Sequence, residues 1–82
     1  MKRNEIELLL TQIFSVLLKR EVMTGEVIDR SSEPNWDSLL HLDLIMTVES
    51  ELNIQLSVDE IEKCISKHSM AEILGEQIGA DA

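Results

Sequence analysis

The first quarter of the chain carries apolar residues at the spacing of one helix face. They recur three or four positions apart, at Ile6, Leu9, Leu10, Ile13, Phe14 and Leu17. Such a stripe is typical of a helix that packs on a core. Asn4 and Glu7 are spaced like a capping box, in which the acid reaches back to the cap amide, while Lys19 suits the negative end of a helix dipole. The pattern predicts a helix over about residues 4–20.

A long segment without helical periodicity comes next. Residues 21–36 contain Gly, Pro, Ser and Asn, which predicts a loop that includes a turn. In compact domains a connection of this length is usually functional or disordered. Because Val22, Val27 and Ile28 are apolar, we expect them to anchor this loop on the core and keep it ordered.

A second helix is predicted from about residue 37 to residue 52. Its apolar residues cover most of a helical wheel, at Leu39, Leu42, Ile45, Met46, Val48 and Leu52. This distribution predicts a mostly buried helix, with Asp43, Thr47 and Glu51 on the remaining polar arc. Leu40 falls on the same arc, so we expect this side chain to face water.

Two further helices are indicated by capping signals nearer the C-terminus. Ser57 begins a Ser-x-x-Glu sequence, the pattern of a capping box, which predicts a short helix over about residues 58–64. Ser69 begins a second such sequence and predicts a last helix over about residues 70–79. The sequence therefore predicts an all-α, four-helix bundle with three longer helices, one short third helix and a long loop between the first two.

Length and composition indicate one small domain. The 82 residues are 44% hydrophobic, with one Trp, one Phe and no Tyr, so the core is expected to consist of Leu, Ile, Val and Met. A domain of this size buries too little surface to enclose a deep catalytic cleft. We therefore expect a monomeric carrier, adaptor or interaction module and not an enzyme.

The net charge of the chain indicates which class of molecule it can bind. The chain has 16 Asp plus Glu against 7 Lys plus Arg, a formal net charge of -9. A nucleic acid would be repelled by this charge, whereas a protein with a basic surface would be attracted. Partners are therefore expected to be basic proteins.

Cysteine content and hydropathy bear on the environment of the protein. The single cysteine, Cys64, excludes an internal disulfide and is expected to be a small buried side chain, and no His and Cys spacing resembles a metal site. Glu5 and Glu7 interrupt the first apolar run, so we do not expect a signal peptide. With no apolar run of about 18 residues, we expect no membrane insertion and a cytoplasmic location.

Ser38 is the candidate for covalent chemistry. It follows an acid, precedes Leu39 and lies where the long loop changes into a helix. A hydroxyl in the first turn of a helix lies near unpaired backbone amides at the positive end of the dipole, where an attached phosphate is favoured. Asp and Ser are also the commonest N-caps, so the tripeptide Asp37-Ser38-Leu39 alone is better explained by simple capping.

The wider pattern around this serine resembles the acyl carrier proteins. The residues that carry the resemblance are Trp36-Asp37-Ser38-Leu39, Leu42, Leu44-Ile45-Met46, Val48-Glu49 and Glu51-Leu52. The likeness extends from the first helix to the last and covers nearly the entire chain. Trp36 before the turn and His41 after it resemble specialised carriers of one dedicated pathway more than the general fatty-acid carrier.

The resemblance implies a role for Ser38 and for two further sets of residues. A phosphopantetheinyl transferase would move 4'-phosphopantetheine from coenzyme A onto Ser38, and the arm would hold acyl groups as thioesters for acyl-loading and acyl-processing enzymes. The positions that match the docking surface for these basic enzymes are Asp37, Leu39, Asp43, Met46 and Glu49. The positions expected to line an apolar acyl cavity are Leu42, Met46, Ile54, Ile61 and Ile73.

Other interpretations remain open at this point. The docking carboxylates can instead be a solvated helix face with Leu39 and Met46 in the core, and ordinary core packing is the default interpretation of the cavity residues. His41 lies three residues after Ser38, and we expect it to be a solvated surface residue and not a catalytic base. Aminoacyl carriers, including D-alanyl carrier proteins, share the fold, the serine and the arm. An acidic helical interaction module with Ser38 as an unmodified cap is the alternative from a different class.

Overall fold

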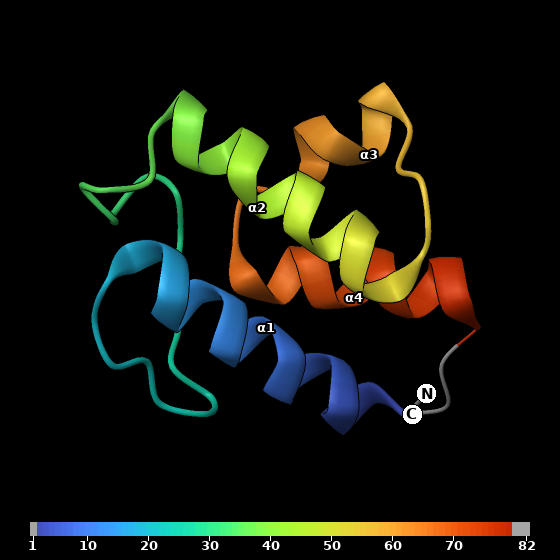
Figure 1. Ribbon diagram of the computed structural model, residues 1–82, viewed down its shortest axis with the longest axis horizontal. Helices are drawn as coiled ribbons and strands as arrows, with labels where there is room; N and C mark the ends of the chain where they lie inside the picture. The colour runs from blue at the N-terminus through green and yellow to red at the C-terminus, as the bar shows by residue number, and fades with distance from the viewer. Residues whose placement is uncertain (1, 80–82) are drawn as a thin grey trace.

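Four α-helices make up most of the computed structural model, which describes residues 2–79 (Figure 1). Their bounds are α1 Arg3–Leu18, α2 Ser38–Leu52, α3 Val58–Lys63 and α4 Lys67–Ile78. The residues that the structure describes contain no β-strand. The all-α class predicted from the sequence is therefore confirmed.

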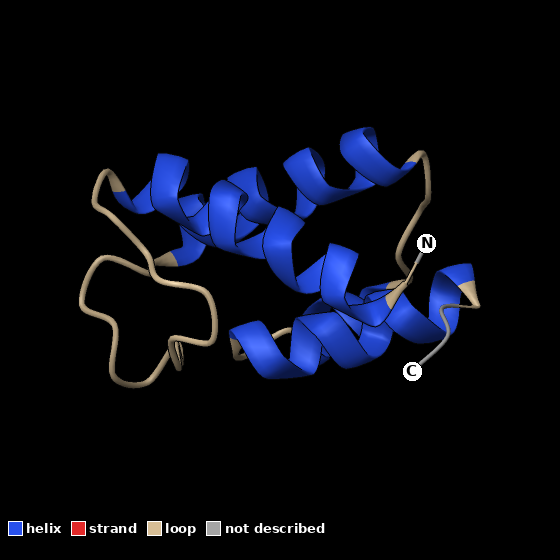
Figure 2. Ribbon diagram, turned by 90° about the horizontal axis from the view of Figure 1, so that it is seen from below, coloured by secondary structure: helices blue, strands red, loops and turns tan. Residues whose placement is uncertain are grey.

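The helices pack around α1 and α4. α1 lies against both α2 and α4, and α3 lies against α4. Figure 2 shows that the loop between α1 and α2 occupies one end of the molecule. The radius of gyration of 11.6 Å equals the value of about 11.7 Å expected for a globular chain of this length. In the part of the chain that the structure describes, no helix is both long and apolar enough to cross a membrane.

The centre of the core contains both aromatic residues of the chain. Phe14 and Trp36 are buried and their ring centroids lie 5.2 Å apart in an edge-to-face arrangement, the geometry that aromatic quadrupoles prefer. The largest fully buried aliphatic side chains around them are Ile6, Leu10, Leu44, Met70, Leu74 and Val48. The aliphatic core expected from composition is thus built around an aromatic pair, half of which comes from the loop.

The N-terminal cap of α1 differs from the sequence prediction. The helix begins at Arg3, and the carboxylate of Glu5 accepts a hydrogen bond of 2.8 Å from the Lys2 amide. Asn4 is therefore inside the helix, and its predicted role as the cap is wrong. The helix ends at Leu18, two residues before the predicted end, because the next residue, Lys19, adopts a left-handed conformation with φ 58°.

The start of α4 is also earlier than predicted. Ser66 caps the helix and accepts a hydrogen bond of 2.9 Å from the Ser69 amide. The predicted cap at Ser69 is wrong because this residue lies in the first turn of the helix, where its hydroxyl completes the capping box that Ser66 begins, and Glu72, its expected partner, pairs with Arg3 at 2.7 Å. The capping box that Ser57 begins is present at the start of α3, so that prediction is confirmed.

The buried face of α2 is only partly the one predicted from the sequence, since Ile45 and Val48 are buried and Asp43 and Glu51 are exposed as expected. Its buried residues are His41, Leu44, Ile45 and Val48, which have the spacing of one helix face. Leu39, Leu42 and Met46, by contrast, are 70%, 57% and 66% exposed. Leu40, which was expected to face water, is half-buried and packs against the core. Either of two apolar stripes on this helix could face the core. Which stripe is buried depends on His41, a residue that the sequence pattern counts as polar.

The loop before α2 is held by its own ion pairs and by the junction of α3 and α4. The Arg20 guanidinium donates to Glu26 at 2.9 Å and to Glu33 at 2.8 Å. The Met23 amide and then Arg20 hold the pKa of the Glu26 carboxyl below its usual range. Backbone amides also tie the loop down, since Arg30 donates to the Ile65 carbonyl at 2.9 Å.

The apolar anchors of this loop are only partly those expected. Val22 and Ile28 are buried, as predicted, but Val27 is 89% exposed. The carbonyl of Ile28 accepts a hydrogen bond of 2.9 Å from the Lys67 amide, which fixes this part of the loop on the start of α4. Val27 therefore points away from the contact that its neighbour makes.

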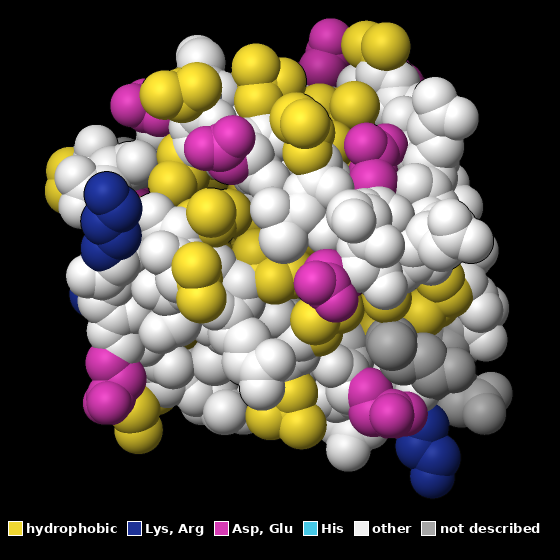
Figure 3. Space-filling view, in the orientation of Figure 1, with side chains coloured by type: hydrophobic (Ala, Val, Ile, Leu, Met, Phe, Trp, Pro, Cys, Tyr) yellow, Lys and Arg dark blue, Asp and Glu magenta, His cyan; other side chains and the backbone are white. Residues whose placement is uncertain are grey.

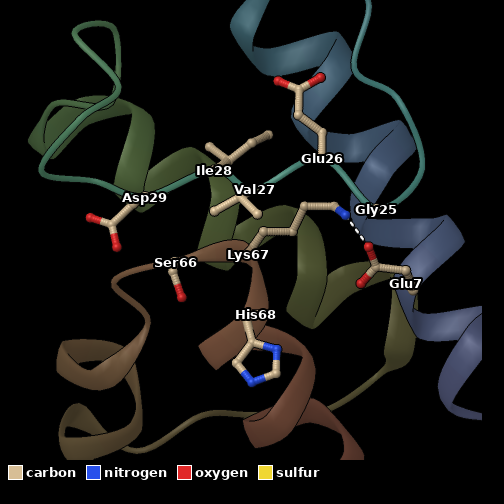
Figure 4. Close-up of a pocket in the computed structure, with 9 residues that line it drawn as sticks. All are labelled: Glu7, Gly25, Glu26, Val27, Ile28, Asp29, Ser66, Lys67 and His68. Atoms are coloured by element: carbon tan, nitrogen blue, oxygen red, sulfur yellow. Dashed lines mark hydrogen bonds and ion pairs between the residues drawn. The ribbon is translucent and has the colours of Figure 1, made fainter.

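A buried ion pair joins α1 to α4 beneath this loop. The Lys67 ammonium, only 2% exposed as a residue, donates to the Glu7 carboxylate (Figure 4). The Glu7 side chain keeps 30% of its surface in solvent. The two charged groups are therefore buried to different extents. Removing one of them should change the free energy of unfolding by a different amount than removing the other.

We predict that Glu7→Ala lowers the free energy of unfolding by about 3 kcal/mol, because it leaves a buried ammonium without its counter-charge. Lys67→Met should cost less than about 1 kcal/mol, since the remaining carboxylate can be hydrated. Urea denaturation followed by Trp36 fluorescence measures both values, with Glu72→Ala at an exposed pair as the control. Equal costs, or a larger cost for Lys67→Met, would contradict this account.

Candidate functional site

Ser38 is the first residue of α2 and is exposed to solvent. The preceding residue, Asp37, is the N-cap, and its carboxylate accepts a hydrogen bond of 2.9 Å from the Leu40 amide. Within residues 2–79 the Ser38 hydroxyl takes part in no hydrogen bond. Capping is thus performed by Asp37, and the serine hydroxyl is left available at the helix surface.

The position of this helix start is fixed by Trp36, two residues before the serine. Trp36 is 4% exposed, and its amide donates to the Glu33 carbonyl at 3.1 Å to close the turn that contains Pro34. Burial of an indole removes a large apolar surface from water. The chain therefore passes from a buried anchor at Trp36 to an exposed hydroxyl at Ser38 within two residues.

His41 connects this anchor to α3. The Trp36 indole N–H donates to His41 Nδ1 at 3.1 Å, and His41 Nε2 lies 3.1 Å from the Ile61 carbonyl oxygen. Because the indole nitrogen can only donate, Nδ1 must be the acceptor and Nε2 must carry the proton that it donates to Ile61. The imidazole is 7% exposed, so its predicted place on the solvated surface is wrong.

These contacts decide what Ser38 can do chemically. Both ring nitrogens of His41 are engaged with Trp36 and Ile61, so the imidazole is not free to take a proton from the serine. No other described residue forms a hydrogen bond with the hydroxyl. The site therefore presents a serine that can accept a group from another protein, but it lacks the partner base that an activated nucleophile needs.

The residues expected to form the docking surface divide into two groups. Asp37, Leu39, Asp43 and Met46 are all exposed, on the first turn of α2 or the turns that follow. Glu49 is half-buried, and its carboxylate accepts a hydrogen bond of 2.8 Å from the Leu56 amide. Glu49 thus joins the end of α2 to the segment before α3.

The residues expected to line an acyl cavity are not gathered in one place. Leu42 and Met46 face solvent, so the prediction that they line an internal cavity is wrong for these two. Their orientation follows from the burial of the opposite stripe of α2. The remaining three, Ile54, Ile61 and Ile73, are half-buried and pack against the core, and their place in a cavity stays a prediction.

The outward face of α2 is instead apolar with acidic neighbours. Leu39, Leu42 and Met46 follow one another at helical spacing and are more than half exposed. In Figure 3, hydrophobic and acidic side chains are interspersed over α2, and the Lys and Arg side chains visible on this face lie at its margins. Exposed apolar side chains that form a row on one helix face are typical of protein contact sites.

The pocket drawn in Figure 4 is separate from this site. It encloses about 230 Å³ between α1, the loop and the start of α4, with no lining residue from α2. Most of its charged groups are engaged, Lys67 with Glu7 and Glu26 with Arg20 in ion pairs and Asp29 with the Ser31 amide and hydroxyl in hydrogen bonds. No cluster of metal-ligating side chains occurs within residues 2–79.

Cys64 is part of the core. It is fully buried, as predicted, and its thiol donates to the Glu60 carbonyl at 3.2 Å. Burial, followed by the charge of Glu60, raises the pKa of the Cys64 thiol to about 11. The thiolate, which is the reactive form, is therefore disfavoured at neutral pH.

Comparisons with protein-family models, with curated proteins and with solved structures find no match. The functional interpretation consequently depends on the geometry of Ser38 and on the residue pattern around it. Sequence reasoning missed the contact between Trp36 and His41, although their positions on either side of Ser38 offered a signal. In this structure the two rings are stacked with their centroids 6.0 Å apart.

We predict that His41→Ala lowers the free energy of unfolding by about 2–4 kcal/mol, because it leaves the buried Trp36 N–H unpaired and opens a cavity, although the Ile61 carbonyl keeps the Cys64 amide as a donor. The matched control is His68→Ala, since His68 is exposed on α4 and its loss should change stability by less than about 0.5 kcal/mol. Urea denaturation of both variants measures the difference. Equal effects of the two substitutions would show that His41 is not part of a buried network.

Proposed function

We propose that the protein is a carrier of the acyl carrier protein type, with 4'-phosphopantetheine attached to Ser38. The observation that carries the proposal is the outward, unbonded hydroxyl of Ser38 on the first turn of a helix whose start is fixed by Trp36. A carrier needs an attachment point that is accessible to several enzymes and does not move relative to the fold. In this proposal the four helices and the long loop between α1 and α2 are the scaffold that carries Ser38.

The residues around Ser38 fit such an attachment. The amides of Ser38 and Leu39 lie in the first turn of α2 without a partner in that helix, and the dipole of the 15-residue α2 favours negative charge there. Asp37 keeps its carboxylate on the Leu40 amide, so the cap does not occupy the serine hydroxyl. A phosphodiester on Ser38 would project into solvent next to these amides.

Attachment requires a separate transferase. The bond from Ser38 Oγ to phosphorus forms as the phosphoanhydride bond of coenzyme A breaks, adenosine 3',5'-bisphosphate leaves, and the hydroxyl proton goes to a base of the transferase. The chain itself has no base free for this step, because His41 is engaged on both nitrogens. When attached, the arm supplies a thiol that carries an acyl group as a thioester, at high effective concentration for successive enzymes.

The outward face of α2 supports docking of those enzymes. Leu39, Leu42 and Met46 provide apolar contact area next to Ser38, and Asp37 and Asp43 provide negative charge. A basic partner would be steered toward this face by the charges and held by the apolar residues. Trp36 and His41 favour a specialised carrier with dedicated partners over a general one, because in the resemblance to acyl carrier proteins they are more like the specialised members.

An unmodified interaction module is the second candidate. It is favoured by the cap of Asp37 on the Leu40 amide, which explains the Asp-Ser pair without any covalent group. In that case the apolar row on α2 would bind a basic partner directly. The two candidates differ only in whether Ser38 is modified, which one experiment decides.

We predict that incubation with coenzyme A and a promiscuous phosphopantetheinyl transferase adds the mass of one phosphopantetheinyl group to the chain. The reason is that Ser38 presents an unobstructed hydroxyl at the helix start. Intact-mass spectrometry measures the addition. Ser38→Ala should remain unmodified, whereas Ser50→Ala, which removes another exposed serine of α2, should be modified like the wild type. An unchanged wild-type mass with an active transferase would favour the interaction module.

We also predict that Asp43→Lys slows association with the transferase about tenfold at low salt, because it reverses a charge on the docking face. Its free energy of unfolding should stay within about 0.5 kcal/mol of the wild type. Glu49→Lys should instead cost about 1–2 kcal/mol, since the buried Leu56 amide loses its acceptor. Stopped-flow binding and urea denaturation measure the two effects. An unaltered association rate for Asp43→Lys would contradict an acidic docking face.

A further inference from the structure

A groove between α1 and α2 lies outside the site described so far. It encloses about 320 Å³ and is lined by Leu9, Gln12, Ile13, Val16, Leu17, Thr47 and Glu51. Five of these residues come from α1 and two from α2. Figure 3 shows hydrophobic side chains gathered in the region between these two helices. The groove is therefore mainly apolar and opens on the same face of the molecule as α2.

The apolar wall of the groove is mostly continuous with the core, since Ile13 is buried and Leu9 and Leu17 pack against it. The core side of α1 is already occupied by its fully buried residues Ile6, Leu10 and Phe14. Val16, by contrast, is 73% exposed at the edge of the groove. Large apolar side chains that remain exposed beside a concave apolar surface are a feature of protein contact sites.

The rim of the groove is acidic. Glu51 lies on its α2 side, and Asp43 lies in an adjoining hollow that shares Leu17, Thr47 and Glu51 with it. Neither acid forms an ion pair with any residue in the range 2–79. The net charge of -9 adds to the local field, so a second copy of this chain would be repelled while a basic protein would be attracted.

We propose that this groove is a docking site for a basic amphipathic helix of a partner protein. The α1 wall extends from Leu9 to Leu17, about 12 Å at 1.5 Å per residue, which equals about two turns of a helix. A helix of that length can place apolar side chains at i, i+3 or i+4, and i+7 in the groove. Lysine or arginine residues on its flanks would then face Asp43 and Glu51.

The surface shares only Asp43, on its rim, with the one assigned to the enzymes that act at Ser38. Its central residues, Ile13, Val16 and Leu17, lie on α1, and it does not include Ser38 or Leu39. Binding in the groove requires no group on the serine. A partner held there leaves the first turn of α2 accessible, so the chain could be held by one protein while another reaches Ser38.

The test uses a helix-stapled peptide with leucines at i, i+3, i+4 and i+7 and lysines at the flanking positions, added to the ¹⁵N-labelled full chain at low salt. The proposal predicts amide chemical-shift changes at Ile13, Val16, Leu17, Thr47 and Glu51. Val16→Lys should weaken binding by at least about tenfold. Val27→Lys makes the same charge change at an exposed valine outside the groove and should leave the affinity within about twofold.

Each alternative result would overturn the proposal. Shifts confined to Leu39, Leu42 and Met46 would assign the peptide to the outward face of α2 alone. Equal weakening of peptide binding by Val16→Lys and Val27→Lys would show that the peptide is bound by the net charge of the chain and not by the groove. Amide chemical shifts of the groove residues that change with protein concentration in the absence of peptide would identify a second copy of the chain as the occupant. Because the chain is unmodified in this experiment, failure here is independent of the outcome for phosphopantetheine attachment at Ser38.

Discussion

The contact between the Trp36 indole and the His41 imidazole is the constraint on which the rest of the site depends. Trp36 packs edge-to-face on Phe14 of α1, donates to His41 on α2, and through that ring is linked to the Ile61 carbonyl of α3. Three helices and the loop are thus joined at one point. The start of α2 has a fixed position because the residue two before it and the residue three after it are both buried.

The same contact determines which face of α2 meets solvent. With His41 inward, Leu44, Ile45 and Val48 follow into the core, and Leu39, Leu42 and Met46 are left outside. An apolar row on an exposed helix has a cost in solubility that a negative charge of -9 offsets. This row lies on the same helix as the exposed Ser38, an arrangement that fits the carrier function proposed above. The groove between α1 and α2 adds further apolar surface.

Much of the helical architecture could be predicted from the sequence, because apolar spacing and the Ser57 capping box are local signals. Helix starts were less predictable where several residues could cap, as at Asn4 and at Ser69, because the caps that form, at Lys2 and Ser66, use other partners, Glu5 and Ser69. The orientation of α2 could not be predicted, since His41 counts as polar until its donor and acceptor are known. The burial of Lys67 could not be predicted from the sequence either, because its partner Glu7 is 60 residues away in the chain.

The candidate serine itself could be predicted, because its position depends only on a loop that ends and a helix that begins. Its chemistry depends on what is bound to it in the cell. The most direct measurement is mass spectrometry of the protein isolated from its native cells, with the peptide that contains Ser38 sequenced. The account predicts a phosphopantetheinyl group, free or acylated, on that serine and on no other residue. A population in which Ser38 is uniformly unmodified would contradict it.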